Sequence, residues 1–184
     1  MRRDAVRNRE RVLTAARSAI ADLGLDASYH DIARYAEVGV GTVYRHFPQR
    51  DDLVEALLVD ILGQLNAQAR EALARPGAWE GFSSFFTSLA QEFRANSGLS
   101  GSLEQVPGAH VAAARQELLD NIRALVARAQ SDGALAGDVH WHEVLALCAA
   151  VPADDSCVLG TTLTSKQADR CIAIMLSGLR NPST

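Results

Sequence analysis

Apolar residues recur at helical spacing along nearly the whole chain, and this pattern predicts a protein built from helices. No strand-like alternation of apolar and polar residues stands out, so the expected fold class is all-α. Glycine and proline separate the helices, most clearly at Pro76-Gly77 and Pro107-Gly108. The stretch 152–163 is expected to be a loop, and a short helix is expected after residue 101. The main predicted helices cover residues 6–24, 28–36, 40–46, 53–75, 79–95, 118–133, 142–151 and 164–179.

Residues 28–53 combine two short helices and a tight turn ahead of a long helix. Ser28 is a good N-cap, and Asp31 follows three residues later, where a capping box has its acidic residue. This order of elements is that of a helix-turn-helix, whose second helix enters the major groove of DNA. Helix-turn-helix geometry also occurs in helical proteins that bind no DNA, so spacing alone leaves both interpretations open. The residues expected to face inward are Ile32, Ala33, Tyr35, Ala36 and Val38.

The second short helix carries side chains that suit phosphates and base edges. Thr42, Tyr44 and Arg45 offer hydroxyl and guanidinium donors near the front of this helix. Gly41 weakens the helix by about 1 kcal/mol relative to alanine. A glycine makes sense there if a backbone must approach another surface closely.

This segment resembles the DNA-binding domain of the TetR family of bacterial transcriptional repressors, and the similarity covers roughly residues 10–55. Two positions depart from the family pattern. Glu37 stands where the family usually has glycine. Gly39 fits the small residue of the pattern, but a capping serine is common there. The matching residues are Ile32, Ala33, Ala36, Val38, Gly39, Gly41, Thr42, Val43, Tyr44, His46, Phe47, Arg50 and Leu53.

The resemblance implies an N-terminal three-helix, helix-turn-helix DNA-binding domain over residues 1–50. A helical ligand-binding and dimerisation domain would follow over residues 51–184. It also implies a homodimeric repressor that binds a palindromic operator in double-stranded DNA and is released by a small effector. Beyond residue 55 only the helical layout resembles the family. The expected DNA contacts are Arg3, Arg7, Thr42, Tyr44, Arg45, His46 and Arg50.

Positive charge is concentrated in the first 50 residues of the chain. This segment contains nine arginines and six acidic residues, a net charge of +3, whereas the rest of the chain carries −7 and the whole chain −4. A basic segment in an acidic protein suits a polyanionic partner. Because +3 is modest, we expect specific binding that is helped by dimerisation.

Phenylalanine is concentrated in the helix 79–95, which holds four of the five in the chain. These side chains either pack the core or line a cavity for an apolar ligand. Arginines such as Arg94 are expected on polar faces, so the effector is expected to be apolar, aromatic or polycyclic, with little net charge. The expected effector-binding residues are Phe82, Phe85, Phe86, Leu89, Phe93, Ile122 and Cys148.

The last helix carries an apolar stripe wide enough to face both its own domain and a partner. The helix 142–151 is similarly apolar, so a two-fold dimer is expected to bury these two helices. The expected interface residues are Val144, Leu147, Ile172, Met175, Leu176 and Leu179.

Several motifs that would indicate an enzyme or a cofactor do not fit. His140 and His142 are two residues apart and would not share a helix face, so no metal site is expected. The segment 98–101 lacks the spacing of a nucleophile elbow, and the segment 39–41 lacks the third glycine of a dinucleotide site. No cofactor and no enzymatic activity are therefore expected.

The three cysteines, Cys148, Cys157 and Cys171, are typical of reduced thiols in a cytoplasmic protein. No apolar run approaches the roughly 18 residues of a membrane span, and no signal peptide is expected. Two alternatives remain. One is a helical small-molecule-binding enzyme, although the apolar stripes lack convergent ionisable residues. The other is a protein-binding adaptor with a vestigial helix-turn-helix.

Overall fold

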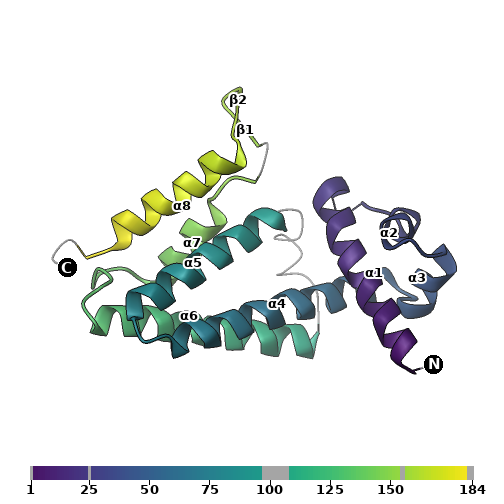
Figure 1. Cartoon of the computed structure of the whole chain (residues 1–184), viewed down its shortest axis with the longest axis horizontal. Coiled ribbons are helices and arrows are strands. Elements are labelled where there is room, and N and C mark those ends of the chain that lie inside the picture. The colour runs from purple at the N-terminus through teal and green to yellow at the C-terminus, as the bar shows by residue number, and fades with distance from the viewer. Residues whose placement is uncertain (1, 25, 97–107, 154–155, 182–184) are drawn as a thin grey trace. The chain divides into compact units, whose positions relative to one another are not determined.

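The computed structural model describes residues 2–24, 26–96, 108–153 and 156–181. Within them the chain forms eight helices and one short hairpin, which confirms the predicted all-α fold class (Figure 1). The helices are α1 (Arg2–Leu23), α2 (Tyr29–Ala36), α3 (Val40–His46), α4 (Arg50–Ala74), α5 (Ala78–Ala95), α6 (Ala109–Ser131), α7 (Trp141–Ala149) and α8 (Ser165–Leu179).

The stretch 152–163, expected to be a loop, instead contains two short antiparallel strands, β1 (Cys157–Val158) and β2 (Thr161–Thr162). The turn between them has positive φ angles at Leu159 and Gly160, the geometry that joins two-residue hairpins. The short helix expected after residue 101 lies outside the described residues.

The chain forms two compact units. The first, here called the head, combines residues 1–61 and 96–112, and the second, called the body, combines residues 62–95 and 113–184. The division falls within α4 and α6, each of which contributes residues to both units. The first part of α4 thus belongs to the unit that contains the helix-turn-helix.

The core of the head forms where α2 packs against α1 and α3 packs against α2 (Figure 1). Val12, Ala16 and Ile20 of α1 are buried, as their helical spacing predicts. Leu23 has the same spacing but is exposed, because it is the last residue of α1 and the chain turns at Gly24. Helix α1 starts at Arg2, so the arginines near the N-terminus belong to a helix and not to a tail.

The turn of the helix-turn-helix is only partly as predicted. The capping box is confirmed, since the Ser28 side chain accepts from the Asp31 backbone N–H and the Asp31 carboxylate accepts from the Ser28 backbone N–H. Val38, expected to be buried, is half-buried. Tyr35, expected to face inward, is exposed because its hydroxyl donates to the Asp22 carboxylate on α1 at 2.8 Å.

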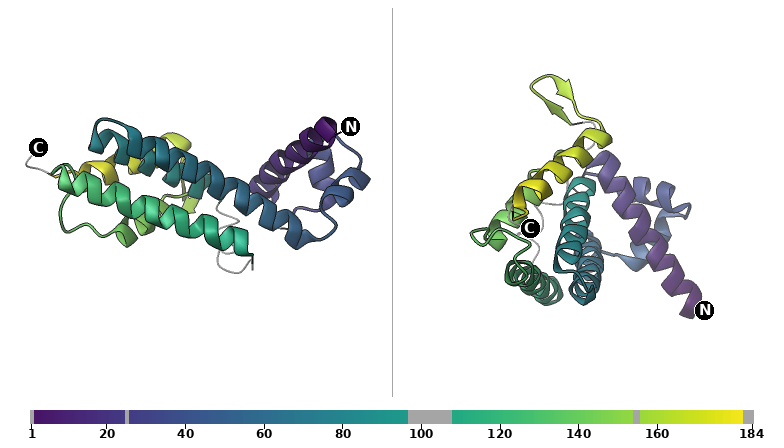
Figure 2. Two further views of the ribbon diagram at one scale, coloured as in Figure 1. Left: turned by 90° about the horizontal axis from the view of Figure 1, so that it is seen from below. Right: turned by 60° about the vertical axis from the view of Figure 1, so that its left-hand side comes forward.

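In the body, α5 packs against α7 and α8, and the part of α4 beyond residue 62 runs beside α6 (Figure 2). Gly81 allows α5 to approach α4, because a Cβ atom there would lie 2.4 Å from the Ala72 carbonyl oxygen. No helix in the described part of the chain is long and apolar enough to cross a membrane.

Two polar side chains connect α4 to α6. Asn66 is buried, and its amide donates to the Ala114 carbonyl at 2.8 Å and accepts from the Asn121 amide at 2.9 Å. A buried amide with partners avoids the cost of desolvation and favours one register of the two helices.

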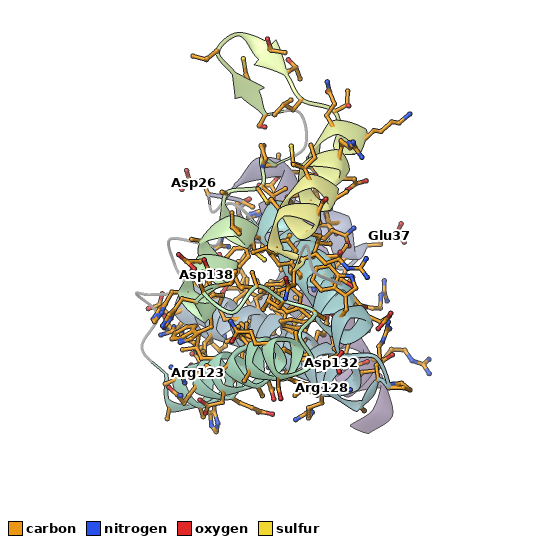
Figure 3. The ribbon with its side chains drawn as sticks, turned by 90° about the vertical axis from the view of Figure 1, so that its left-hand side faces the viewer. Asp26, Glu37, Arg123, Arg128, Asp132 and Asp138 are labelled. Carbon is orange, nitrogen blue, oxygen red and sulfur yellow. The ribbon has the colours of Figure 1, made fainter. Side chains whose placement is uncertain are left out.

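Arg128 of α6 closes the C-terminal end of α4. Its guanidinium, seen with Arg123 in Figure 3, donates to the carbonyls of Leu73, Arg75 and Pro76 at 2.7, 2.5 and 3.0 Å. The last carbonyls of a helix have no partner within the helix, so this contact stabilises the turn into α5.

Candidate nucleic-acid interface

One face of α3 is anchored in the head and the other faces solvent. Val43 and Phe47, the C-cap residue, are buried. Tyr44 is 51% exposed, and Arg45 is also exposed. The structure therefore leaves a phenol and a guanidinium, on consecutive residues of α3, exposed to solvent.

The start of α3 has little local stabilisation. Gly39 occupies the N-cap without a side-chain hydrogen bond. A Cβ atom at Gly41 would meet nothing within 4 Å, so no contact inside the chain requires glycine there. The small surface at Gly41 is open to a partner from outside.

Tyr29, which the sequence analysis did not single out, connects several parts of the site. Its hydroxyl lies 2.8 Å from the Phe47 carbonyl and 2.9 Å from the Gln49 carbonyl. Its ring meets the Tyr44 ring edge-on, with centroids 4.7 Å apart. Burial raises the pKa of Tyr29, opposed in part by the positive charge of Arg50, so the phenol keeps its proton at neutral pH.

An open hollow of about 540 Å³ lies between the start of α2 and the end of α3. It brings together two of the expected DNA contacts, Tyr44 and Arg50, and adds His30, which is exposed. Thr42, Arg45 and His46 do not line it; of these, Thr42 and His46 are half-buried. The residues that line the hollow are Asp26, Ala27, Ser28, Tyr29, His30, Tyr44, Pro48 and Arg50.

The arginines of α1 differ in their roles. Arg7 is exposed, whereas the side chain of Arg3 lies outside the described part of the structure. The Arg9 guanidinium lies 5.1 Å from the centre of the Phe47 ring, and Arg11 donates to the Ala36 carbonyl at 2.8 Å. Arg9 and Arg11 are exposed but still make contacts with other residues of the head.

Glu37 takes the left-handed position at the end of α2, with φ 52°. The next N–H, of Val38, donates back to Ala33, and that of Glu37 donates to Arg34, the hydrogen-bond pattern of a Schellman motif. This position favours glycine. The Glu37 side chain is exposed and projects away from the ribbon (Figure 3).

The expected effector residues lie in the body, mostly in its core. All are buried except Phe93, which is half-buried. The rings of Phe82 and Phe86 lie 6.1 Å apart, and the Cys148 thiol is 3.8 Å from the Phe86 carbonyl. Burial raises the pKa of Cys148 to about 12, so its thiol is neutral. The expectation that Arg94 lies on a polar face is wrong, because its side chain is 8% exposed and bonds to Asp169.

The expected interface residues divide into two groups. Val144, Ile172 and Leu179 are buried within the chain, while Leu147, Met175 and Leu176 are half-buried. The sequence analysis missed Ile174 of α8, which is 57% exposed. The helical spacing of Ile174 from neighbouring residues of α8 could have identified it from the sequence. The residues that share a helix face with it are Cys171, Met175 and Gly178.

The histidine pair does not have the geometry expected from its spacing. His140 precedes α7 with an extended backbone, and its ring Nδ1 lies 3.4 Å from Nδ1 of His142. The two rings therefore meet although the residues are two apart. In the described part of the chain, no group of three or more His, Cys, Asp or Glu side chains could hold a metal ion.

Comparison with known proteins identifies the family of this chain. Residues 12–57 match the bacterial regulatory proteins of the tetR family, and residues 76–181 match the C-terminal domain described as transcriptional regulator SbtR-like. A solved TetR transcription regulatory protein from Mycobacterium vanbaalenii is 31% identical, with a TM-score of 0.71 and coverage of 97% of this chain and 98% of that one. A TetR transcriptional regulator from Streptomyces coelicolor is 28% identical, with a TM-score of 0.72 and coverage of 95% and 99%.

A curated HTH-type transcriptional regulator from Staphylococcus aureus is 39% identical over 54 residues, which are 29% of each chain. A helix-turn-helix formed by α2 and α3, with one face of α3 exposed, followed by a helical body, defines a helix-turn-helix transcriptional regulator. The chain belongs to the TetR family of transcriptional regulators. This is a family of DNA-binding regulators and not of enzymes.

The geometry at Glu37 generates a prediction. Glu37→Gly removes both the strain of a left-handed glutamate and a negative charge at the turn beside α3. We expect the free energy of unfolding to rise by about 0.5–1 kcal/mol and DNA to bind more tightly at low salt. Glu37→Gln is the control, since it removes the charge but keeps the side chain, and it should strengthen binding without raising the melting temperature. A glycine variant less stable than the parent would contradict the prediction.

Proposed function

We propose that this protein is a homodimeric, cytoplasmic repressor that binds a palindromic operator through α3 and is released by a small apolar effector. The observation that carries the DNA-binding part is that α3 is buried on one face and exposed on the other. Its inner face is fixed by Val43 and Phe47, and its outer face offers Tyr44 and Arg45 to solvent. We assign Arg3, Arg7, Thr42 and His46, together with Arg50, to the same interface.

The chemistry of these side chains indicates which part of the DNA each of them would contact. A guanidinium can bond a guanine edge or a phosphate with two donors, whereas a phenol hydroxyl bonds a single phosphate oxygen. Arg45 stands on the exposed face of α3, and Tyr44 and Arg50 line the same hollow. We therefore assign base or phosphate recognition to Arg45 and phosphate contact to Tyr44 and Arg50.

A selection of genomic fragments with the purified protein would yield the operator. On that fragment, Arg45→Ala should weaken binding by about 1–3 kcal/mol, with little change in folding because the side chain is exposed. Arg123→Ala, which removes an exposed arginine from α6 in the body, is the matched control and should bind like the parent. Equal affinity of Arg45→Ala and the parent, measured by fluorescence anisotropy, would remove Arg45 from the site. No DNA binding by the parent at low salt would favour the adaptor alternative.

For the dimer, the relevant surface is the face of α8 that is not buried against the rest of the body. Cys171, Ile174, Met175 and Gly178 recur at the spacing of one helix face, and Ile174 is largely exposed. An apolar strip with a small residue suits close packing against a second copy of α8. Leu147 and Leu176 would extend this contact, while the buried residues Val144, Ile172 and Leu179 support it from the core.

Ile174→Glu should convert the dimer to a monomer at micromolar concentration, because a charge would be buried without a partner. Sedimentation of the parent, of Ile174→Glu and of Ala173→Glu would test this expectation. Ala173 is also exposed on α8 but lies on another side of the helix, so its variant should remain dimeric. A parent that sediments as a monomer would overturn the proposed assembly.

The effector site is assigned to the phenylalanine-rich side of α5. Phe82, Phe85, Phe86 and Leu89 form an apolar core with Ile122 and Cys148, and the charge of Arg94 is balanced by Asp169. A cavity opened among these side chains would have little net charge. An uncharged aromatic or polycyclic ligand therefore fits better than a sugar, a nucleotide or a metal ion.

Release of the operator fragment by a panel of small molecules would test this assignment. Neutral aromatic compounds should release the DNA, and Phe93→Ala should reduce their effect while leaving operator binding in place. Phe93 is preferable to Phe86 because it is half-buried, whereas removing a fully buried phenylalanine costs about 3–5 kcal/mol. Release by strongly charged compounds alone would contradict an apolar site.

A further inference from the structure

Tyr29 is the first residue of α2, and its hydroxyl reaches the link between α3 and α4. The two carbonyls within its reach, those of Phe47 and Gln49, stand on either side of Pro48. Gln49 immediately precedes Arg50, the first residue of α4. One phenol hydroxyl thus connects the start of α2 to the end of α3 and the start of α4.

The ring of Tyr29 makes a second connection. It meets the Tyr44 ring at an interplanar angle of 63°, with centroids 4.7 Å apart. Tyr29 itself is 9% exposed, whereas Tyr44 is mostly exposed. Edge-to-face aromatic pairs restrict the orientation of both rings. The buried ring therefore limits the directions in which the exposed phenol can point.

We propose that Tyr29 is a positioning residue for DNA binding, which orients Tyr44 through its ring and Arg50 through its hydroxyl. The inference rests on the proposed function, because Tyr44 and Arg50 are assigned there to the DNA backbone. Tyr29 lines the same hollow as both side chains, so its contacts would set their geometry before DNA arrives. Side chains held in the bound geometry lose less conformational entropy on binding, which strengthens the complex.

Tyr29→Phe isolates the hydroxyl, because phenylalanine keeps the ring beside Tyr44. We expect it to weaken binding to the selected operator fragment about fivefold, the worth of one typical hydrogen bond. Tyr35→Phe is the matched control. It removes a tyrosine hydroxyl from the same helix, but that hydroxyl bonds Asp22 and not the link between α3 and α4. This control should bind like the parent, and thermal melting of each variant corrects for any loss of folded protein.

A double-variant cycle with Arg50→Ala separates positioning from general stabilisation. If Tyr29 acts through Arg50, the loss in Tyr29→Phe with Arg50→Ala is smaller than the product of the two single losses. The salt dependence is a second readout. It should become shallower in Tyr29→Phe, because the slope reports the number of phosphate contacts, whereas partial unfolding would leave it unchanged.

Reduced affinity with a shallower salt slope and non-multiplying losses would support the assignment. Full affinity of Tyr29→Phe, or losses that simply multiply, would overturn it while leaving the proposed function intact. A parent that binds no duplex DNA at low salt would overturn the proposed function and the role of Tyr29 together.

Discussion

The surface of the head that we propose binds DNA depends on the burial of one face of α3. A helix of seven residues is not stable by itself in water, where isolated helices shorter than about 12–15 residues are marginal. Gly41 weakens it further. The side chains of Val43 and Phe47 are buried away from water, and this burial of apolar surface holds α3 against the rest of the head. Their inward direction also determines which side chains remain outside, so the exposure of Tyr44 and Arg45 is a consequence of packing.

Two of the arginines of the head contact other residues of the head. Arg11 donates to the Ala36 carbonyl at the end of α2, and Arg9 lies over the ring of Phe47. Both partners are neutral, so these contacts leave the net charge of +3 in the first 50 residues unchanged but direct the two guanidiniums toward the protein. Affinity for DNA rises steeply with the number of phosphates neutralised, so two heads on one palindrome would gain what a single head lacks.

The sequence predicted those features whose signals are local. The capping box of Ser28 with Asp31 lies within one helical turn and is confirmed. The features that the sequence analysis missed or misplaced depend on contacts with residues distant in the sequence. The hydroxyl of Tyr29 bonds residues 18 and 20 positions away, and Arg94 pairs with Asp169 across 75 positions. Helical periodicity alone cannot reveal such partners, because it reports which face of a helix is apolar and not what that face meets.

The two departures from the family pattern weaken the same short segment. Glu37 occupies a backbone conformation that favours glycine, and Gly39 gives α3 an N-cap without a side-chain acceptor. Local stabilisation of the turn is therefore low, and the position of α3 relies on long-range contacts, chiefly the buried Val43 and the hydroxyl of Tyr29. An element held in this way can shift when a long-range contact changes, without unfolding of the head. The direction in which the segment presents Tyr44 and Arg45 therefore depends on these long-range contacts.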